Sequence, residues 1–467
     1  MASDGPAPTT LPPSMALPPP PPELPTLAFP GVEQHRLDNG LDVVVSARPD
    51  APLTTVALTV GACSERDPGA GRLVAHAVTA GGAGRYSASQ LRQHLAAEGT
   101  DFDVEIGVDA VSWSLTVLPE RIAFAIEALA AIARQPQWVY AEFARVRDQQ
   151  MQRAQELVHH DGTWPALQLL YRELFPSPHP YHTYDATADQ LAHVNLAACQ
   201  SWHRRHVRPD NASIVVVGPN ASAEVVELVE KHLGSWKASG EPTDARTALA
   251  VPSQSDEFVL HLVDQDQSDR AQLLVGWVVP GDGTEDHAIV RQSVRLLCGP
   301  RGRFVATGTE RISHCQVTTY QGDVGLALVG VTTTPRRVSA TVKRLMAALR
   351  RLQSESATED ALLGSARDLL GSTPRRWESS RGLAHELARL SLLGAPPNAR
   401  EAEARVWKSV DATRIQETFR RYLSLELGVF AVTADASKVA NSLSKLAPVA
   451  MHPASDLETT RRLPKVD

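Results

Sequence analysis

The sequence predicts an α+β protein built from two homologous lobes that face each other across a cleft. The chain has 467 residues, which exceeds one ordinary hydrophobic core and fits two domains of about 200 residues each. Short sequence features of the first half also recur in the second half, about 215 residues later. Gly61 corresponds to Gly276 at 215 residues, Arg204 corresponds to Arg420 at 216, and the Ala-Ser pair that opens the last helix of each half recurs at 215. A shared offset indicates an internal duplication, and duplicated units commonly bind ligands in the cleft between them.

The composition is that of an ordinary globular protein and excludes two classes of function. Lys and Arg total 46 against 53 Asp and Glu, a net charge of −7, so there is no excess of cations to neutralise phosphates and nucleic-acid binding is not expected. The longest apolar runs, such as 128–133, are far shorter than the roughly 20 residues of a membrane span. No transmembrane helix is expected.

The amino terminus is expected to be a disordered tail through residue 33. Eleven of the 33 prolines fall within residues 1–30, a composition typical of an extended spacer or of a ligand for SH3-type domains. A basic segment followed by an apolar one, the pattern of a secretory signal, is not visible. The expected location is therefore cytoplasmic, or periplasmic if an export signal is missing from this chain.

The first domain, residues 34–236, is expected to mix strands and helices. Residues 111–117 alternate in hydrophobicity as strands do, Ser87 and Gln90 form a capping box that opens a helix, and Gly234 is placed to end the last helix. The expected strands are 41–47, 53–61, 111–117 and 212–218, and the expected helices are 87–96, 119–135, 140–159, 164–174, 197–206 and 222–233.

The second domain, residues 257–450, is expected to repeat this order after a polar linker over 237–256. Residues 258–264 and 271–277 are expected to pair as neighbouring strands, and residues 451–467 to form a flexible tail. The remaining expected elements are a strand at 428–432 and helices at 285–297, 337–352, 358–370, 377–393, 412–423 and 437–446.

Motif searches within the chain yield no complete catalytic site. His385-Glu386-x-x-Arg389 resembles HExxH, but arginine cannot ligate zinc, so an ordinary amphipathic helix is expected. The segment 299–303 (GPRGR) is basic but lacks the Lys-Ser/Thr pair of a phosphate-binding loop, and is expected to be a structural turn. The four cysteines form no CxxC pair and are expected to be buried free thiols: Cys63, Cys199, Cys298 and Cys315.

The order of segments resembles the insulinase/pitrilysin-like metallopeptidases, which include the subunits of the mitochondrial processing peptidase. The likeness covers about residues 34–446. It implies two lobes, each a mostly antiparallel sheet covered by helices, and it explains the duplication. The segments that carry it are 37–45 (LDNGLDVVV), 60–62 with Glu65, 71–77 (GRLVAHA), 86–91 (YSASQL), 172–175, 179–181, 202–206, 208–218 (RPDNASIVVVG) and 264–280.

The same resemblance implies that the catalytic metal site is lost. The family's motif H-x-x-E-H supplies two zinc ligands and a general base, and the matching positions here hold Arg72, Ala75 and His76. Arginine would repel the metal and alanine cannot act as a base. The family's third ligand, a glutamate on a later helix, aligns with Ala154 or Gln155, which leaves the carboxylate of Glu156 displaced by one or two positions.

A second set of family residues is also incomplete. Catalytic members supply an arginine and, seven residues later, a tyrosine that bind substrate. Arg303 or Arg311 could stand for the arginine, but the nearest tyrosine is Tyr320, nine residues after Arg311. We expect Arg72 to form an ion pair in the vacated pocket, with Glu156 or Asp161 as its partner.

Three functions follow from these residues. The first is a catalytically inactive, peptidase-like subunit that pairs with an active, zinc-containing homologue and helps to enclose peptide substrates. The second is a non-enzymatic scaffold or peptide-binding protein, comparable to the core subunits of respiratory complexes. The third is an active hydrolase with rearranged ligands, such as His76, Glu156 and another histidine. The first two need no cofactor, and zinc is expected only under the third.

Overall fold

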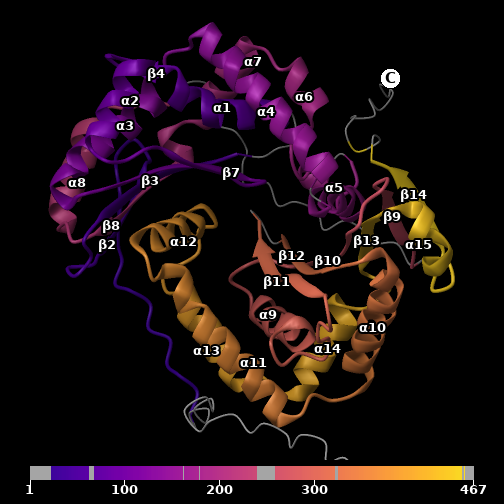
Figure 1. The fold of residues 1–467 in the computed structure, drawn as a ribbon. Helices are drawn as coiled ribbons and strands as arrows, with labels where there is room; N and C mark the ends of the chain where they lie inside the picture. Colours follow the sequence, from indigo (N-terminus) through magenta and orange to yellow (C-terminus); the bar gives the residue numbers. More distant parts are fainter. Residues whose placement is uncertain are drawn as a thin grey trace, which may run out of the picture.

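The computed structural model describes residues 23–62, 68–160, 162–177, 179–238, 258–320, 324–454 and 457. Two six-stranded sheets form the centres of two lobes, which curve around a common interior (Figure 1). The expected linker over 237–256 lies almost entirely outside the described residues, as do Cys63, Glu65 and Asp161. Among the described helices, none is long and apolar enough to cross a membrane.

Five strands of each sheet repeat one topology, which confirms the predicted α+β fold and its duplication, while the sixth strand differs, β1 being antiparallel to β2 and β14 parallel to β9. The first sheet has the order β1-β2-β8-β3-β7-β6 and the second has the order β11-β12-β10-β13-β9-β14. Most neighbouring strands are antiparallel, while β2–β8, β9–β13 and β9–β14 are parallel. The strands are β1 Glu33–Arg36, β2 Asp42–Ala47, β3 Thr54–Gly61, β6 Asp103–Ile106, β7 Ala110–Val117, β8 Ala212–Gly218, β9 Leu260–Asp264, β10 Ala271–Pro280, β11 Arg311–Thr319, β12 Val324–Thr333, β13 Val429–Ala434 and β14 Val449–Pro453.

Strand pairing differs from the expectation at one point. β9 and β10 are not neighbours, because β13 lies between them, parallel to β9 and antiparallel to β10. The expected pairing of 258–264 with 271–277 was therefore wrong. β13 comes about 150 residues later in the chain, and hydrophobic alternation within β9 and β10 carries no information about which distant strand separates them.

Helices cover the outer faces of both sheets (Figure 1). The capping box at Ser87 and Gln90 forms as expected and opens α2. A small ribbon of β4 Gly82–Ala83 and β5 Tyr86–Ser87 precedes it. The helices are α1 Pro68–Ala80, α2 Ala88–Ala97, α3 Ile122–Arg134, α4 Tyr140–His160, α5 Thr163–Leu174, α6 Ala188–His193, α7 Leu196–His206, α8 Ser222–Leu233, α9 Glu285–Cys298, α10 Pro335–Ser354, α11 Glu359–Ser372, α12 Ser380–Leu392, α13 Ala399–Ser409, α14 Ala412–Tyr422 and α15 Ala436–Leu443.

The lobes exchange one helix each. α5 packs on β10 and β13 of the second sheet, whereas α12 packs on β3 and β8 of the first. Their first residues are 217 positions apart (380 − 163), so the exchange follows the duplication. Gly276 lies beneath α5, where an added Cβ would come within 2.7 Å of Leu170. Each half has a hydrophobic core of its own, and two further apolar clusters are formed by residues of both halves.

Both expected tails are shorter than the sequence indicated. Leu27 is buried and Phe29 packs edge-on against Trp377 of the second half, with ring centroids 4.8 Å apart. The backbone N–H of Phe29 also donates to Glu401, at 3.0 Å. At the other end, β14 pairs with β9 through residue 453. Apolar side chains among the prolines anchor residues 24–32 to the helices of the second half.

A disulfide overturns part of the expectation for the cysteines. Cys298, the last residue of α9, is bonded to Cys315 of β11, with their Cα atoms 5.8 Å apart, which is an ordinary separation for a disulfide. Cys199 is a buried thiol, as expected. A separation of 17 residues without a CxxC pattern gave no sign of the bond, because it depends on the turn that brings β11 back over α9.

Candidate functional site

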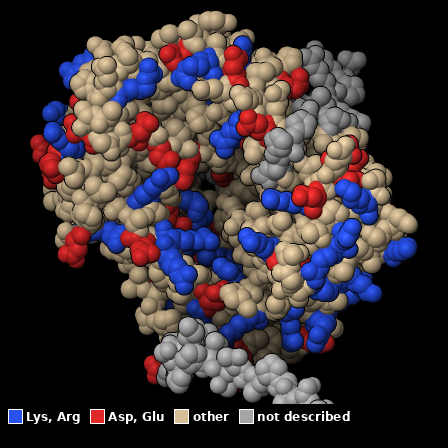
Figure 2. All heavy atoms as spheres, in the orientation of Figure 1, with Lys and Arg blue, Asp and Glu red and all other residues tan. Residues whose placement is uncertain are grey.

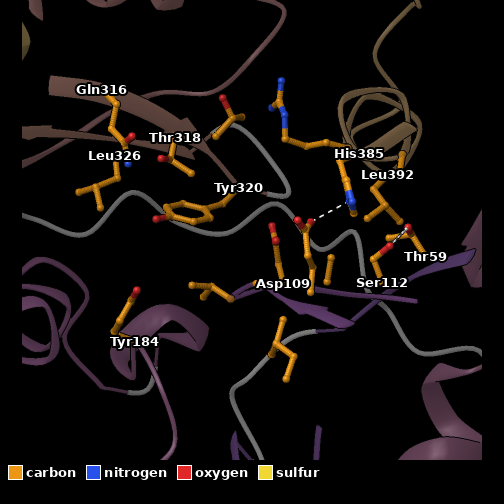
Figure 3. Close-up of a pocket in the computed structure, with 18 of the residues that line it drawn as sticks. Thr59, Asp109, Ser112, Tyr184, Gln316, Thr318, Tyr320, Leu326, His385 and Leu392 are labelled. Carbon is orange, nitrogen blue, oxygen red and sulfur yellow. Dashed lines mark hydrogen bonds and ion pairs between the residues drawn. The ribbon is translucent and has the colours of Figure 1, made fainter. Parts of the chain in front are cut away.

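A chamber of about 870 Å³ lies between the two lobes. Figure 2 shows this face of the molecule hollowed near its middle, with acidic and basic side chains around the opening. The first lobe contributes β6, β7 and the loop 183–186, and the second contributes β11 and α12. Asp109 of the first lobe lies across from Gln316, Thr318 and Tyr320 of the second (Figure 3).

Sequence reasoning predicted β7 but missed three other strands at this chamber, β6, β11 and β12. β6 has four residues and β11 has mixed polarity, so neither gives a strong strand signal by itself. β12 is apolar throughout and was a detectable signal. The duplication offered another route, since β6 and β7 of the first sheet correspond to β11 and β12 of the second.

The degenerate zinc motif lies on α1, where Arg72 reaches the chamber wall. Its guanidinium holds Asp185 through Nη2, at 2.6 Å, and through Nε, at 2.8 Å. Nη1 donates to Gln150 of α4, at 3.3 Å. The expected ion pair therefore exists, but the expected partner Glu156 was wrong. Glu156 is exposed and accepts a hydrogen bond from Gln152, at 3.0 Å.

The surroundings of His76 do not fit a zinc ion. Its Nε2 is buried without a hydrogen-bond partner among the described residues. Burial, followed by the nearby charges of Arg72 and Arg153, lowers the pKa of His76 to about 4. Ala75 is fully buried and supplies only its carbonyl oxygen, which accepts from Trp113. Two guanidinium groups beside one imidazole oppose a divalent cation.

The remaining family positions are also unsuited to catalysis. Ala154 is buried against the first lobe's core, while Gln155 and Glu156 point outward. Arg311 begins β11 and Tyr320 follows its end, which places them roughly 30 Å apart at about 3.3 Å per residue. The Tyr320 hydroxyl is hydrogen-bonded to that of Tyr171. No arginine–tyrosine pair is formed by these residues.

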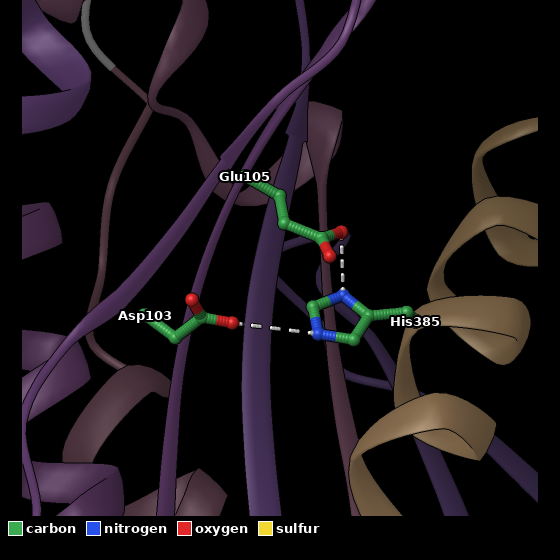
Figure 4. A group of neighbouring side chains, drawn as sticks. All are labelled: Asp103, Glu105 and His385. Carbon is green, nitrogen blue, oxygen red and sulfur yellow. Dashed lines mark ion pairs between the residues drawn. The ribbon is translucent and has the colours of Figure 1, made fainter.

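The near-HExxH helix has a different role, because His385 joins the two lobes (Figure 4). Its Nδ1 lies 2.8 Å from Glu105 and its Nε2 lies 3.8 Å from Asp103, both on β6. Arg381 of α12 also contacts Asp103. The hydrogen bond from His385 lowers the pKa of Glu105. These contacts fasten the second half to the edge strand of the first sheet.

Two groups among the described residues bring three potential metal ligands together, and neither contains His76. The first is Asp103, Glu105 and His385, where Arg381 already supplies the positive charge. The second is Asp282, His287 and Glu403, where Arg400 is paired with both carboxylates. Guanidinium groups thus take the place that a metal ion would need, and the described residues offer no set of ligands around His76 for a rearranged hydrolase.

Replacing Arg72 by alanine is expected to lower the free energy of unfolding by about 2 kcal/mol. The carboxylate of Asp185 is largely buried, and the substitution removes the cation that pairs with it. A double-mutant cycle with Asp185→Asn should give a coupling of about 1–2 kcal/mol. The matched control is Arg85→Ala, whose pair with Glu127 is exposed and should contribute less than about 0.5 kcal/mol. An Arg72→Ala variant as stable as the wild type would contradict the assigned pair.

Buried histidines of α7 predict sensitivity to acid. Burial lowers the pKa of His203 and of His206 to about 4, whereas an unfolded histidine titrates near 6.5. Between these values the unfolded chain binds more protons, so stability should be unaffected above pH 6.5 and should fall from pH 6.5 to 4. Urea unfolding across this range should be less pH-dependent in His206→Gln than in the exposed control His193→Gln. Equal slopes would contradict the prediction.

Parts of the chain are similar in sequence to a known protein family and to a known protease. The family model described as the peptidase M16 inactive domain matches residues 193–367. A stretch of 133 residues is 28% identical to the zinc protease PqqE of Helicobacter pylori, covering 28% of this chain and 30% of that relative. These partial matches support the resemblance of the chain to the insulinase-like M16 peptidase family. The match to an inactive-domain model suggests a non-catalytic M16 homologue, in keeping with the residues on α1 and α4.

Solved structures agree on the fold of this M16 homologue. A peptidase M16 inactive domain from Pseudomonas fluorescens superposes with a TM-score of 0.75 at 17% identity, covering 91% of this chain and 99% of that one. A chain of complex III2 from Candida albicans, solved with Inz-5 bound, superposes with a TM-score of 0.71 at 14% identity, covering 89% and 100%.

Proposed function

We propose that this chain is a non-catalytic M16 subunit that pairs with a zinc-containing homologue and contributes to a chamber that encloses peptide. The observation that carries the proposal is the Arg72–Asp185 ion pair at the lost metal position, beside a chamber that remains open. A chain that only needed a stable fold would have no reason to keep 870 Å³ between its lobes, because filling such space with side chains would add packing energy.

The chamber offers peptide two kinds of contact. β6 and β11 are the outermost strands at one end of each sheet, so one edge of each is unpaired among the described strands. An extended peptide can add to such an edge through backbone hydrogen bonds. The walls supply charges of both signs, including Glu105 and Arg376. In this proposal the chain binds and orients peptide, while the bond is cleaved by the zinc of the partner.

The test is zinc content and peptidase activity of the chain alone and after co-expression with a homologue from the same genome that keeps H-x-x-E-H. We expect no zinc on the chain alone, and one equivalent with peptidase activity in a copurifying pair. Replacing the motif glutamate of the homologue should abolish that activity, whereas Arg72→Ala in this chain should not. One equivalent of zinc on the chain alone would overturn the proposal.

A second candidate is a scaffold without a peptidase partner. It is favoured by the likeness in fold to a chain of complex III2, and it requires no reaction. The same co-expression separates the two functions. Absence of zinc together with absence of a copurifying homologue would support the scaffold.

A further inference from the structure

We propose that a second, smaller pocket on the second lobe binds a multiply charged oxyanion of the phosphate or pyrophosphate class. The pocket has a volume of about 270 Å³ and lies between the carboxyl end of α9, the turn that follows it, and α11. It includes Arg301 of the basic turn 299–303 but shares no lining residue with the interlobe chamber. The proposal is independent of the function proposed above.

Positive charge in this pocket exceeds what the protein itself neutralises. Four arginines line it against one carboxylate, that of Asp368, which pairs with Arg295 at 3.4 Å. Arg301 and Arg375 have no hydrogen-bond or ion-pair partner in the part of the chain that the structure describes. The carboxyl ends of α9 and α11 contribute about half a negative charge each. With Arg295 paired to Asp368 and Arg367 left out of the sum because it has interactions of its own, a net charge of about +1 remains, in a protein whose overall charge is −7.

The shape of the pocket suits a small anion. Its floor includes Gly364 and Gly371, one above the other on α11. The Arg301 Cδ lies 3.6 Å from the Cβ position of Gly364, whereas the Cβ position of Gly371 faces open space. Arginine binds phosphoryl oxygens through paired N–H groups. A volume of about 270 Å³ lies below the range of about 300–1,000 Å³ of drug-sized sites, which favours a single phosphate or pyrophosphate.

The test uses the full chain with inorganic phosphate and pyrophosphate as probes, against sodium chloride at matched ionic strength. We expect saturable binding by calorimetry and a rise in melting temperature with pyrophosphate that chloride does not reproduce. Arg301→Gln combined with Arg375→Gln should weaken binding at least about tenfold. The matched control is Arg92→Gln, an exposed arginine of the other lobe, which should bind as the wild type does.

A second variant keeps every charge and removes only the space. Gly371→Leu adds a side chain where an added Cβ would meet no atom within 4 Å and improves helix propensity, so it should fold and yet lose pyrophosphate binding. The proposal fails if the wild type shows no saturable binding of pyrophosphate. It also fails if Arg301→Gln/Arg375→Gln and Gly371→Leu both bind pyrophosphate as tightly as the wild type does. Binding of hexaglutamate but not of pyrophosphate at this pocket would also overturn it, in favour of an acidic protein segment.

Discussion

Replacing Glu403 by glutamine is expected to lower the free energy of unfolding by about 3–5 kcal/mol. The carboxylate of Glu403 on α13 is almost fully buried and contacts the guanidinium groups of Arg291 and Arg400, the latter at 2.6 Å. The side chain of Arg291 is itself buried, and this burial lowers its pKa. Removing the anion leaves the buried Arg291 without the carboxylate that pairs with it, whereas Arg400 keeps its ion pairs with Asp282 and Glu386.

Urea unfolding followed by tryptophan fluorescence measures this effect, because the ring of Trp407 lies 5.0 Å from the Arg291 guanidinium carbon and reports on the same region. The matched control is Glu426→Gln, which removes the same charge from an exposed site and should change stability by less than about 0.5 kcal/mol. A Glu403→Gln variant within about 1 kcal/mol of the wild type would mean that the network adds little to the second lobe.

Loss of the Cys298–Cys315 disulfide is expected to cost about 3 kcal/mol, the value for a closed loop of about this length. The bond closes a loop of 17 residues and fastens β11, which lines the chamber, to α9 beneath it. Urea unfolding of the wild type with and without reductant should show the difference. The control is the double variant Cys298→Ser/Cys315→Ser, in which reductant should have no effect.

The disulfide also bears on where the protein works. Disulfides persist in oxidising compartments and are uncommon in a reducing cytoplasm, so we propose the periplasmic alternative in place of the cytoplasmic one. Mass spectrometry of the unreduced protein, isolated from its native cells, should find the two cysteines linked. Finding both as thiols in that material would count against this location and against the stabilising role of the bond.

The sequence by itself determined the duplication and the type of most elements. Helical and strand periodicity depend on residues only a few positions apart, which is why α2, α8 and β7 lie close to where they were expected. The departure from the family's zinc motif could also be predicted without coordinates, because arginine at position 72 and alanine at position 75 cannot do the chemistry of histidine and glutamate.

Only the tertiary structure decided how these parts meet. It placed β13 between β9 and β10, exchanged α5 and α12 between the lobes, and closed the disulfide. It also gave Arg72 a partner in Asp185, 113 residues further along the chain. Periodicity describes which face of an element is buried but not what buries it. Which segment covers a buried face depends on packing between parts of the chain that are distant in sequence. The exchanged helices and the buried ion pairs of this protein are contacts of this kind.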